Sequence, residues 1–266
     1  MNTRPIGIFD SGLGGLTVLK ALLKALPHEH FIYFGDSANV PYGAKSKQTV
    51  TNLSLSIARF LQEQDVQLIV VACNTASAQA LPTLQKYCKV PVLGVIEPGA
   101  RKAAHFTKNN RVALLGTEGT VRSQSYEKAL QKINKDIRVF AKACPLFVPL
   151  VEENWTRKEA ARLIAQEYLS PLQKKGVDTI ILGCTHYPIL KPLLSKITGK
   201  NVTLVDPSDT LAGEVKEILT RTGSARTRGR GSVRFYASDD TTRFKRLAKQ
   251  ILHTPIQTVH LKKLNI

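Results

Sequence analysis

Short apolar runs alternate with amphipathic segments along most of this 266-residue chain. The runs have the length of β-strands and are apolar at successive positions, which is typical of strands buried on both faces. Between them, segments such as 16–26 and 53–64 carry apolar residues three or four positions apart, as amphipathic helices do. This alternation predicts an α/β fold with mainly parallel sheets. The expected strands are 6–9, 31–35, 67–72, 90–95, 111–116, 137–143, 178–183 and 201–205.

Polar residues follow these strands at matched points in the two halves of the chain. Asp10 and Cys73 directly follow strands in the first half, and Thr117 and Cys184 do so in the second half. Corresponding positions are 107 residues apart for Asp10 and Thr117 and 111 residues apart for the two cysteines. The repeat predicts two pseudo-symmetric α/β lobes. Because parallel sheets carry their active sites at the carboxyl ends of the strands, we expect the active-site cleft between the lobes.

The chain is expected to leave the first lobe and to return to it. We predict that residues 1–97 and 207–266 form the first lobe and that residues 98–206 form the second. Both divisions fall at proline-containing sequences, which favour a break in regular structure. A strand-like segment at 233–238 and a helix at about 240–251 then complete the first lobe.

Cys73 and Cys184 are the chemically most suggestive residues, because thiols on opposite sides of a cleft can invert a stereocentre. One thiol would remove a proton from a carbon, and the other would return a proton from the opposite side. Each needs help, since a cysteine pKa of about 8.5 leaves little thiolate at neutral pH. We expect both cysteines at helix N-termini, with Asp10 and His186 tuning or relaying the protons. The alternative is that both are ordinary buried cysteines.

Two loops add candidate ligand contacts. The Gly-rich turn at 10–15 offers backbone N–H groups to a carboxylate or phosphate, although a simple tight turn explains it as well. The Pro-Tyr-Gly sequence at 41–43 is expected to cover a substrate, with Tyr42 and the Gly43 amide pointing inward. We expect no metal, because the Cys184-x-His186 pair has no second motif to complete a zinc site.

The net charge of +18, from 38 Lys and Arg against 20 Asp and Glu, raises the possibility of nucleic-acid binding. Residues 221–266 hold 11 of the basic and 2 of the acidic side chains. The segment 221–232 is short and Gly-rich and lacks aromatic residues on which bases would stack. We therefore interpret it as a solvated basic loop, with a weak anion or nucleic-acid contact as the alternative.

The chain carries no apolar run of the roughly 18 residues that a membrane span requires. Its N-terminal sequence does not have the pattern of a signal peptide. No cysteine belongs to a CxxC pair, so we expect free thiols and a cytoplasmic protein. The cysteines are Cys73, Cys88, Cys144 and Cys184.

Taken together, these motifs resemble those of the glutamate racemases in the aspartate/glutamate racemase family. The resemblance extends over essentially the whole chain, and the ACNTAS and GCTHYP sequences that contain the two cysteines are specific as a set. The family's enzymes are cofactor-independent and supply D-glutamate for peptidoglycan. The matching segments are 6–18, 34–46, 71–78, 114–126, 144–153, 182–190 and 235–244.

The resemblance implies roles for individual residues. Cys73 would deprotonate D-glutamate and Cys184 L-glutamate, each carbanion being reprotonated by the opposite thiol. Asp10, Glu152 and His186 would assist proton transfer. The resemblance also implies that no cofactor is needed, and we expect a homodimer. The implied substrate contacts are Asp10, Ser11, Pro41, Tyr42, Gly43, Asn74, Thr75, Thr117, Thr185 and His186.

Three other functions compete with glutamate racemisation. The same two thiols would serve a racemase of aspartate or of another acidic amino acid. A two-lobed amino-acid-binding protein would close on its ligand without chemistry. A nucleic-acid-associated regulator would use residues 221–232, although we do not expect nucleic acid to be the main partner.

Overall fold

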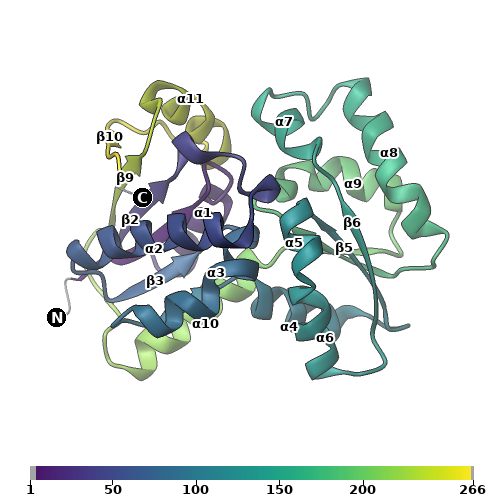
Figure 1. Ribbon diagram of the computed structural model, residues 1–266, viewed down its shortest axis with the longest axis horizontal. Helices are drawn as coiled ribbons and strands as arrows, with labels where there is room; N and C mark the ends of the chain where they lie inside the picture. Colours follow the sequence, from purple (N-terminus) through teal and green to yellow (C-terminus); the bar gives the residue numbers. More distant parts are fainter. Residues whose placement is uncertain (1–3, 265–266) are drawn as a thin grey trace.

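The computed structural model describes residues 4–264, which form two parallel β-sheets with helices on both faces (Figure 1). The larger sheet contains β1 Ile6–Asp10, β2 His30–Gly35, β3 Leu68–Val71, β4 Val92–Gly94, β9 Ser232–Ala237 and β10 His260–Leu261. The smaller sheet contains β5 Arg111–Gly116, β6 Arg138–Ala143, β7 Thr179–Gly183 and β8 Thr203–Val205. Their strand orders are β10-β9-β2-β1-β3-β4 and β6-β5-β7-β8, with every pairing parallel. The predicted fold class is confirmed.

Helices connect the strands and cover both faces of each sheet. They are α1 Leu16–Ala25, α2 Lys47–Glu63, α3 Asn74–Tyr87, α4 Ile96–Phe106, α5 Glu118–Ser123, α6 Ser125–Ile133, α7 Phe147–Glu152, α8 Glu159–Gln173, α9 Lys191–Thr198, α10 Ser208–Arg221 and α11 Thr241–Leu252. Three short 3₁₀ helices, η1 Ser37–Asn39, η2 Tyr42–Ala44 and η3 Tyr187–Leu190, lie in the connections. Among residues 4–264, none of these helices combines the length and the apolar character needed to span a membrane.

Alternate side chains of the central strands enter opposite cores, as the two-sided apolar runs predicted. In β1, Ile8 packs into a core shared with α1, α10 and α11, whereas Phe9 packs into a core shared with α2 and α3. In β5, Leu114 faces the core under α4 and α6, and Leu115 faces the core under α7, α8 and α9. All four side chains are at most 1% exposed. Burial on both faces thus explains why these strands lack polar alternation.

All eight predicted strands are present, with ends that differ from the prediction by at most two residues. The late strand and helix also form, as β9 and α11, and β9 joins the larger sheet beside β2. The two-residue strand β10 was not predicted. The boundaries proposed for the two lobes remain a prediction, and their outermost residues, 1–3 and 265–266, lie outside the described part of the chain.

The two halves meet closely where the turn after β1 lies against the turn after β7. A Cβ atom added to Gly14 would lie 2.3 Å from Thr185 Oγ1 and 2.4 Å from His186 Nδ1. Thr17 Oγ1 donates a hydrogen bond to the Thr185 carbonyl oxygen at 3.0 Å. Gly14 therefore permits a close approach between the halves, whereas Gly15 permits close packing on Asp10 and Tyr33 within its own half.

We expect Gly14→Ala to destabilise the protein by about 1–3 kcal/mol, because the added methyl group must displace the buried side chains of Thr185 and His186. Gly213→Ala is the matched control, since Gly213 lies in α10 with nothing within 4 Å of its added Cβ. That change should stabilise by about 0.5–1 kcal/mol through helix propensity. Urea denaturation followed by circular dichroism measures both effects. Equal stability of the two variants would contradict the close approach.

Candidate active site

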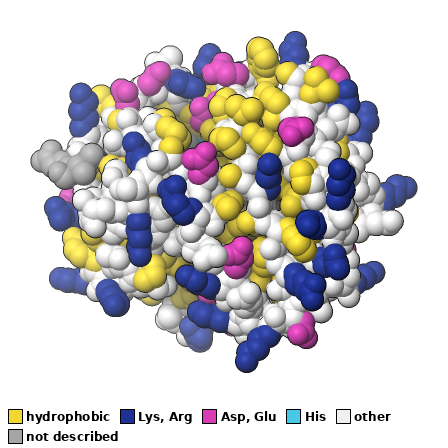
Figure 2. Space-filling view, turned by 45° about the vertical axis from the view of Figure 1, so that its right-hand side comes forward, with side chains coloured by type: hydrophobic (Ala, Val, Ile, Leu, Met, Phe, Trp, Pro, Cys, Tyr) yellow, Lys and Arg dark blue, Asp and Glu magenta, His cyan; other side chains and the backbone are white. Residues whose placement is uncertain are grey.

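A cavity of about 400 Å³ opens between the two sheets, at the carboxyl ends of their strands. Figure 2 shows hydrophobic side chains in a band down the middle of one face, with Lys and Arg side chains spread around it. Of the residues predicted for the site, those that line the cavity are Ser11, Pro41, Tyr42, Gly43, Cys73, Asn74, Thr75, Thr117, Glu152, Cys184, Thr185 and His186. The tertiary structure thus gathers residues from all parts of the sequence around one space, as the matched strand ends predicted.

Asp10 lies behind the cavity wall. It is fully buried and accepts hydrogen bonds from the Gly12 N–H at 2.9 Å and from Thr185 Oγ1 at 3.3 Å. Burial raises the pKa of Asp10, although the nearby charge of His186 and these hydrogen bonds oppose the rise. Asp10 therefore ties the turn after β1 to the turn after β7. Its predicted direct contact with substrate remains a prediction.

Cys73 caps the N-terminus of α3 and contacts the cavity. Its Sγ accepts a hydrogen bond from the Ala76 N–H at 3.5 Å and donates one to Ser11 Oγ at 3.6 Å. Burial, with the neighbouring Asp10 carboxylate, raises the pKa of Cys73 to about 12 despite the two hydrogen bonds. The predicted helix N-terminus is confirmed for this cysteine, but the helix dipole does not outweigh the effect of burial on its pKa.

Cys184 occupies a different local structure, so the predicted helix N-terminus is wrong for it. The chain turns through Thr185 and His186, and only then enters the short 3₁₀ helix η3, with His186 at its cap. The Tyr187 N–H closes this turn on the Cys184 carbonyl oxygen at 3.0 Å. The partner of the Cys184 thiol is instead a side chain, His186 Nδ1, at 3.9 Å.

Cys184 is the end of a chain of polar contacts that leads out of the cavity. His186 Nε2 lies 3.1 Å from Glu152 Oε1, and Glu152 Oε2 accepts a hydrogen bond from Arg243 at 3.0 Å. Burial alone would lower the pKa of His186, but its contacts with Cys184 and Glu152 outweigh burial and raise it to about 10. The Cys184 sulfur therefore has a protonated imidazole as its neighbour.

Glu152 shows the opposite balance. Its burial would raise the pKa of the carboxyl group, but the hydrogen bond and charge of His186, together with Arg243, hold the pKa below its usual value. Glu152 is therefore an anion held between two cations. Among the residues predicted for the site, it had the least support from its own sequence context, yet it occupies a central place in this contact chain.

The polar floor of the cavity joins the two halves. Thr75 Oγ1 and Thr117 Oγ1 lie 2.8 Å apart, and Thr117 Oγ1 also lies 2.9 Å from Thr120 Oγ1. Asn74 Oδ1 accepts a hydrogen bond from the buried Tyr126 hydroxyl at 2.8 Å. Asn74, Thr75 and Thr117 are thus held in place by hydrogen bonds where they line the cavity.

The loop at 41–43 lines the cavity with all three of its residues, and its predicted role in covering a substrate remains a prediction. Tyr42 lines the cavity, but its hydroxyl donates a 2.6 Å hydrogen bond to Asp36, and burial raises its pKa well above the usual value. A Cβ atom on Gly43 would lie 2.7 Å from Thr117 Cβ, so glycine is required where this loop meets the second half. The Tyr42 ring and the backbone, rather than the hydroxyl, are therefore available to a ligand.

Sequence reasoning missed Asp36, Tyr126 and Arg243. Asp36 and Tyr126 hold Tyr42 and Asn74 in position, and Arg243 reaches the cavity from α11. Arg243 lies in the 235–244 segment that matched the family motifs, and this was the available signal. Its distance from Glu152 in the sequence concealed the pairing.

The four cysteines are free thiols, with Cys88 at the end of α3 and Cys144 after β6. Within residues 4–264, no group of three or more His, Cys, Asp and Glu side chains is arranged to hold a metal ion.

Comparisons with known proteins point in one direction. The family model for Asp/Glu/Hydantoin racemase matches residues 6–215. A glutamate racemase of Geobacter metallireducens is 53% identical over 253 residues, which cover 95% of this chain and 94% of the relative. The crystal structure of a Bacillus anthracis glutamate racemase has a TM-score of 0.95 at 35% identity and covers 99% of this chain and 98% of its own. That of Francisella tularensis glutamate racemase with D-glutamate has a TM-score of 0.93 at 38% identity, with the same coverage.

We expect Glu152→Gln to lower the pKa of His186 from about 10 toward its ordinary value of 6.5, because the anion that stabilises the imidazolium is lost. A raised histidine pKa stabilises the fold fully below pH 6.5, and this contribution disappears as the pH rises through about 10. The stability lost in the variant should therefore be larger at pH 6 than at pH 10. NMR titration of the imidazole and urea denaturation at several pH values measure the two effects.

Glu153→Gln is the matched control for this titration. Glu153 is 62% exposed at its side chain and reaches Arg243 at 3.6 Å, so its loss should leave the pKa of His186 nearly unchanged. Equal shifts in the two variants would mean that general charge, rather than the Glu152 contact, sets the pKa of His186.

Proposed function

This chain belongs to the Asp/Glu/Hydantoin racemase family, and we propose that it is a glutamate racemase that interconverts L-glutamate and D-glutamate through two cysteine thiols. The observation that carries the mechanism is that Cys73 and Cys184, from different halves of the fold, line the same cavity. The relatives named glutamate racemase and the structure of one with D-glutamate support the choice of substrate.

In the proposed reaction, the α-carbon of glutamate binds between the two sulfur atoms. The Cys184 thiolate takes the α-proton of L-glutamate, and the electron pair of the broken C–H bond is delocalised into the α-carboxylate. The S–H group of Cys73 then donates its proton to the other face of the carbon. D-glutamate reacts by the reverse sequence, with Cys73 as the base and Cys184 as the acid.

The surroundings of the two thiols suit the L-to-D direction. The pKa of about 12 keeps Cys73 protonated and ready to donate, while Cys184 has the His186 imidazolium as its neighbour. After each turnover the thiols have exchanged protonation states. His186 can relay this proton: its imidazolium first releases a proton to solvent, and its Nδ1 then takes the proton from the Cys184 sulfur, 3.9 Å away. This residue would therefore help to restore the starting state.

Polar groups around the cavity are proposed to hold the two carboxylates of the substrate. Ser11, Asn74, Thr75, Thr117 and Thr185 line the space and supply hydroxyl and amide groups. Their fixed positions reduce the reorganisation needed as negative charge develops on the α-carboxylate. Thr185 is in turn held by Asp10, which gives Asp10 a supporting role.

The cellular setting follows from the family resemblance. We propose that the D-glutamate product enters peptidoglycan synthesis, that the enzyme is cytoplasmic, and that it acts as a homodimer. Racemisation of aspartate or another acidic amino acid is the alternative activity, because the polar groups of the cavity would accept either dicarboxylate.

We expect the purified protein to racemise L-glutamate in D₂O without an added cofactor, with deuterium entering at the α-carbon. Circular dichroism follows the loss of optical activity, and proton NMR follows the α-proton. Cys73→Ser and Cys184→Ser should each lower kcat by about 10²–10⁴-fold, since a serine hydroxyl is a far poorer base and acid. Cys88→Ser is the matched control, because Cys88 lies half-buried at the end of α3 opposite to Cys73. The activity of this variant should be unchanged.

The outcomes separate the competing functions. Turnover of L-aspartate without turnover of L-glutamate would select the alternative racemase. No racemisation and no deuterium entry with either amino acid would refute a racemase. Tight ligand binding that persists in the Cys73→Ser, Cys184→Ser double variant would then indicate a binding protein.

A further inference from the structure

Arg243 connects the two halves of the fold at the mouth of the cavity. It lies in the first turn of α11, which packs on the larger sheet, and its guanidinium pairs with Glu152 of α7, which packs on the smaller sheet. Its side chain is 45% exposed, whereas that of Glu152 is 20% exposed. The pair therefore lies at the boundary between solvent and the buried site.

The contacts of Arg243 lead to only one of the two thiols. Glu152 uses one carboxylate oxygen for Arg243 and the other for His186, whose second ring nitrogen faces Cys184. Cys73 has instead the Ser11 hydroxyl and the Ala76 N–H as partners. The proton transfers at the two thiols are thus supported by different groups, although the two lobes resemble each other.

We propose that Arg243 is a positioning residue for the Cys184 half of the reaction, acting through the orientation of Glu152 and His186. This inference rests on the proposed racemase function. Arg243 fixes the rotation of the Glu152 carboxylate so that its other oxygen meets His186 Nε2. Without the Arg243 guanidinium, Glu152 and His186 still pair on the smaller-sheet half, but the carboxylate loses this constraint.

The expected energies distinguish positioning from stability. A half-exposed ion pair contributes about 0–1 kcal/mol to folding, so the loss of Arg243 should change the free energy of unfolding only slightly. Misplacement of a catalytic group by about 1 Å can lower a rate about 10²-fold. The effect of Arg243 should therefore be seen in the kinetics much more than in stability.

Two consequences follow for the kinetics. Because the two enantiomers have equal free energy in solution, their values of kcat/KM must be equal and must fall together in any variant. An isotope effect on kcat/KM, however, reports each proton transfer separately. Deuterium at the α-carbon of L-glutamate labels the transfer to Cys184, and deuterium in D-glutamate labels the transfer to Cys73.

We expect Arg243→Met to lower kcat/KM about 10- to 100-fold in both directions. The α-deuterium isotope effect should rise for L-glutamate and fall for D-glutamate, because the transfer at Cys184 becomes the slower step. Arg243→Lys keeps the charge but loses the planar guanidinium group. It should recover part of the rate and bring both isotope effects part of the way back to those of the unmodified enzyme. Thermal unfolding should show both variants folded.

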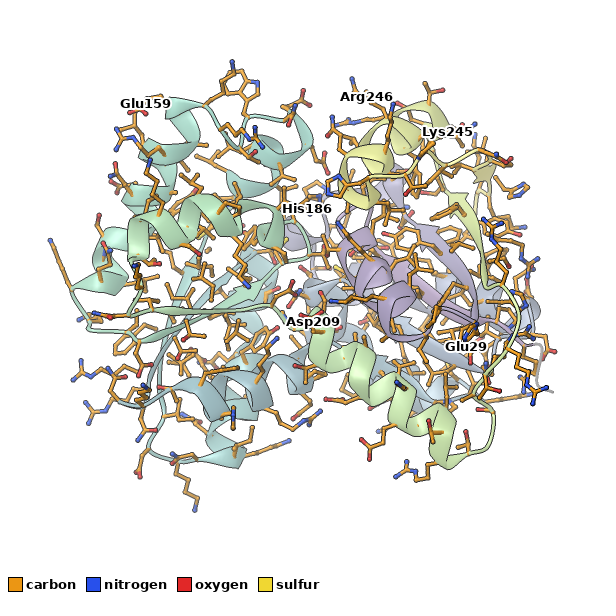
Figure 3. The ribbon with its side chains drawn as sticks, turned by 180° about the vertical axis from the view of Figure 1, so that it is seen from behind. Glu29, Glu159, His186, Asp209, Lys245 and Arg246 are labelled. Carbon is orange, nitrogen blue, oxygen red and sulfur yellow. The ribbon has the colours of Figure 1, made fainter. Side chains whose placement is uncertain are left out.

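Arg246→Met is the matched control, because it removes the same charge from an exposed position of the same helix. Figure 3 shows Arg246 on α11 at a distance from His186, which lies between the two halves. The control should keep the kinetics and isotope effects of the unmodified enzyme.

Three results would overturn the proposal. Isotope effects for both enantiomers that change in the same direction would show no selectivity for the Cys184 face. A rise in KM with kcat unchanged would place Arg243 in substrate binding. Matching losses in the Arg246 variant would indicate a general effect of charge. Because these measurements require an active enzyme, failure of the racemase function itself would already appear as absent deuterium exchange.

Discussion

The approach of the turn after β1 to the turn after β7 is the contact on which the cleft depends. With no side chain at Gly14, the backbone comes close enough to Thr185 and His186 for the Thr17 hydroxyl to reach the Thr185 carbonyl oxygen. The same turn supplies Asp10, which accepts a hydrogen bond from the Thr185 hydroxyl, and Ser11, which contacts Cys73. A shift of these turns would alter the surroundings of both thiols. Ser11 of the first turn contacts Cys73, and His186 of the second turn contacts Cys184.

The two thiols occupy equivalent places in similar lobes, yet they differ in their surroundings. Burial and Asp10 make Cys73 a weak acid, whereas Cys184 adjoins an imidazolium that Glu152 stabilises. A racemase must run in both directions, but nothing requires its two bases to be matched in the resting state. It is enough that the two proton transfers, from the substrate to either thiol, have similar free energies once the substrate lies between them. The asymmetry therefore concerns how each proton transfer is supported, and it is compatible with an equal equilibrium between enantiomers.

The strong positive charge of the chain has little counterpart inside the cavity. Among the described residues that line it, Arg243 and His186 are the basic side chains, and both are paired with Glu152. Recognition of a dicarboxylate would consequently rely on hydroxyl, amide and backbone groups. The segment 221–232 is also bonded to the larger-sheet half through Arg226. Arg226 donates to the buried Glu29 through its backbone N–H and to the His28 carbonyl oxygen through its side chain.

The sequence by itself determined the eight main strands, the parallel α/β class, the return of the chain to the larger sheet and the pair of cysteines at matched strand ends. These follow from local periodicity and from the rule that parallel strands present their carboxyl ends at one edge, so neighbouring residues suffice to predict them. Only the tertiary structure decided that Cys184 faces His186 instead of capping a helix, that Asp10 lies behind the wall, and that Arg243 meets Glu152. The last two residues are 91 positions apart in the sequence, and their contact exists only because α11 and α7 pack on different sheets that face each other across the cleft.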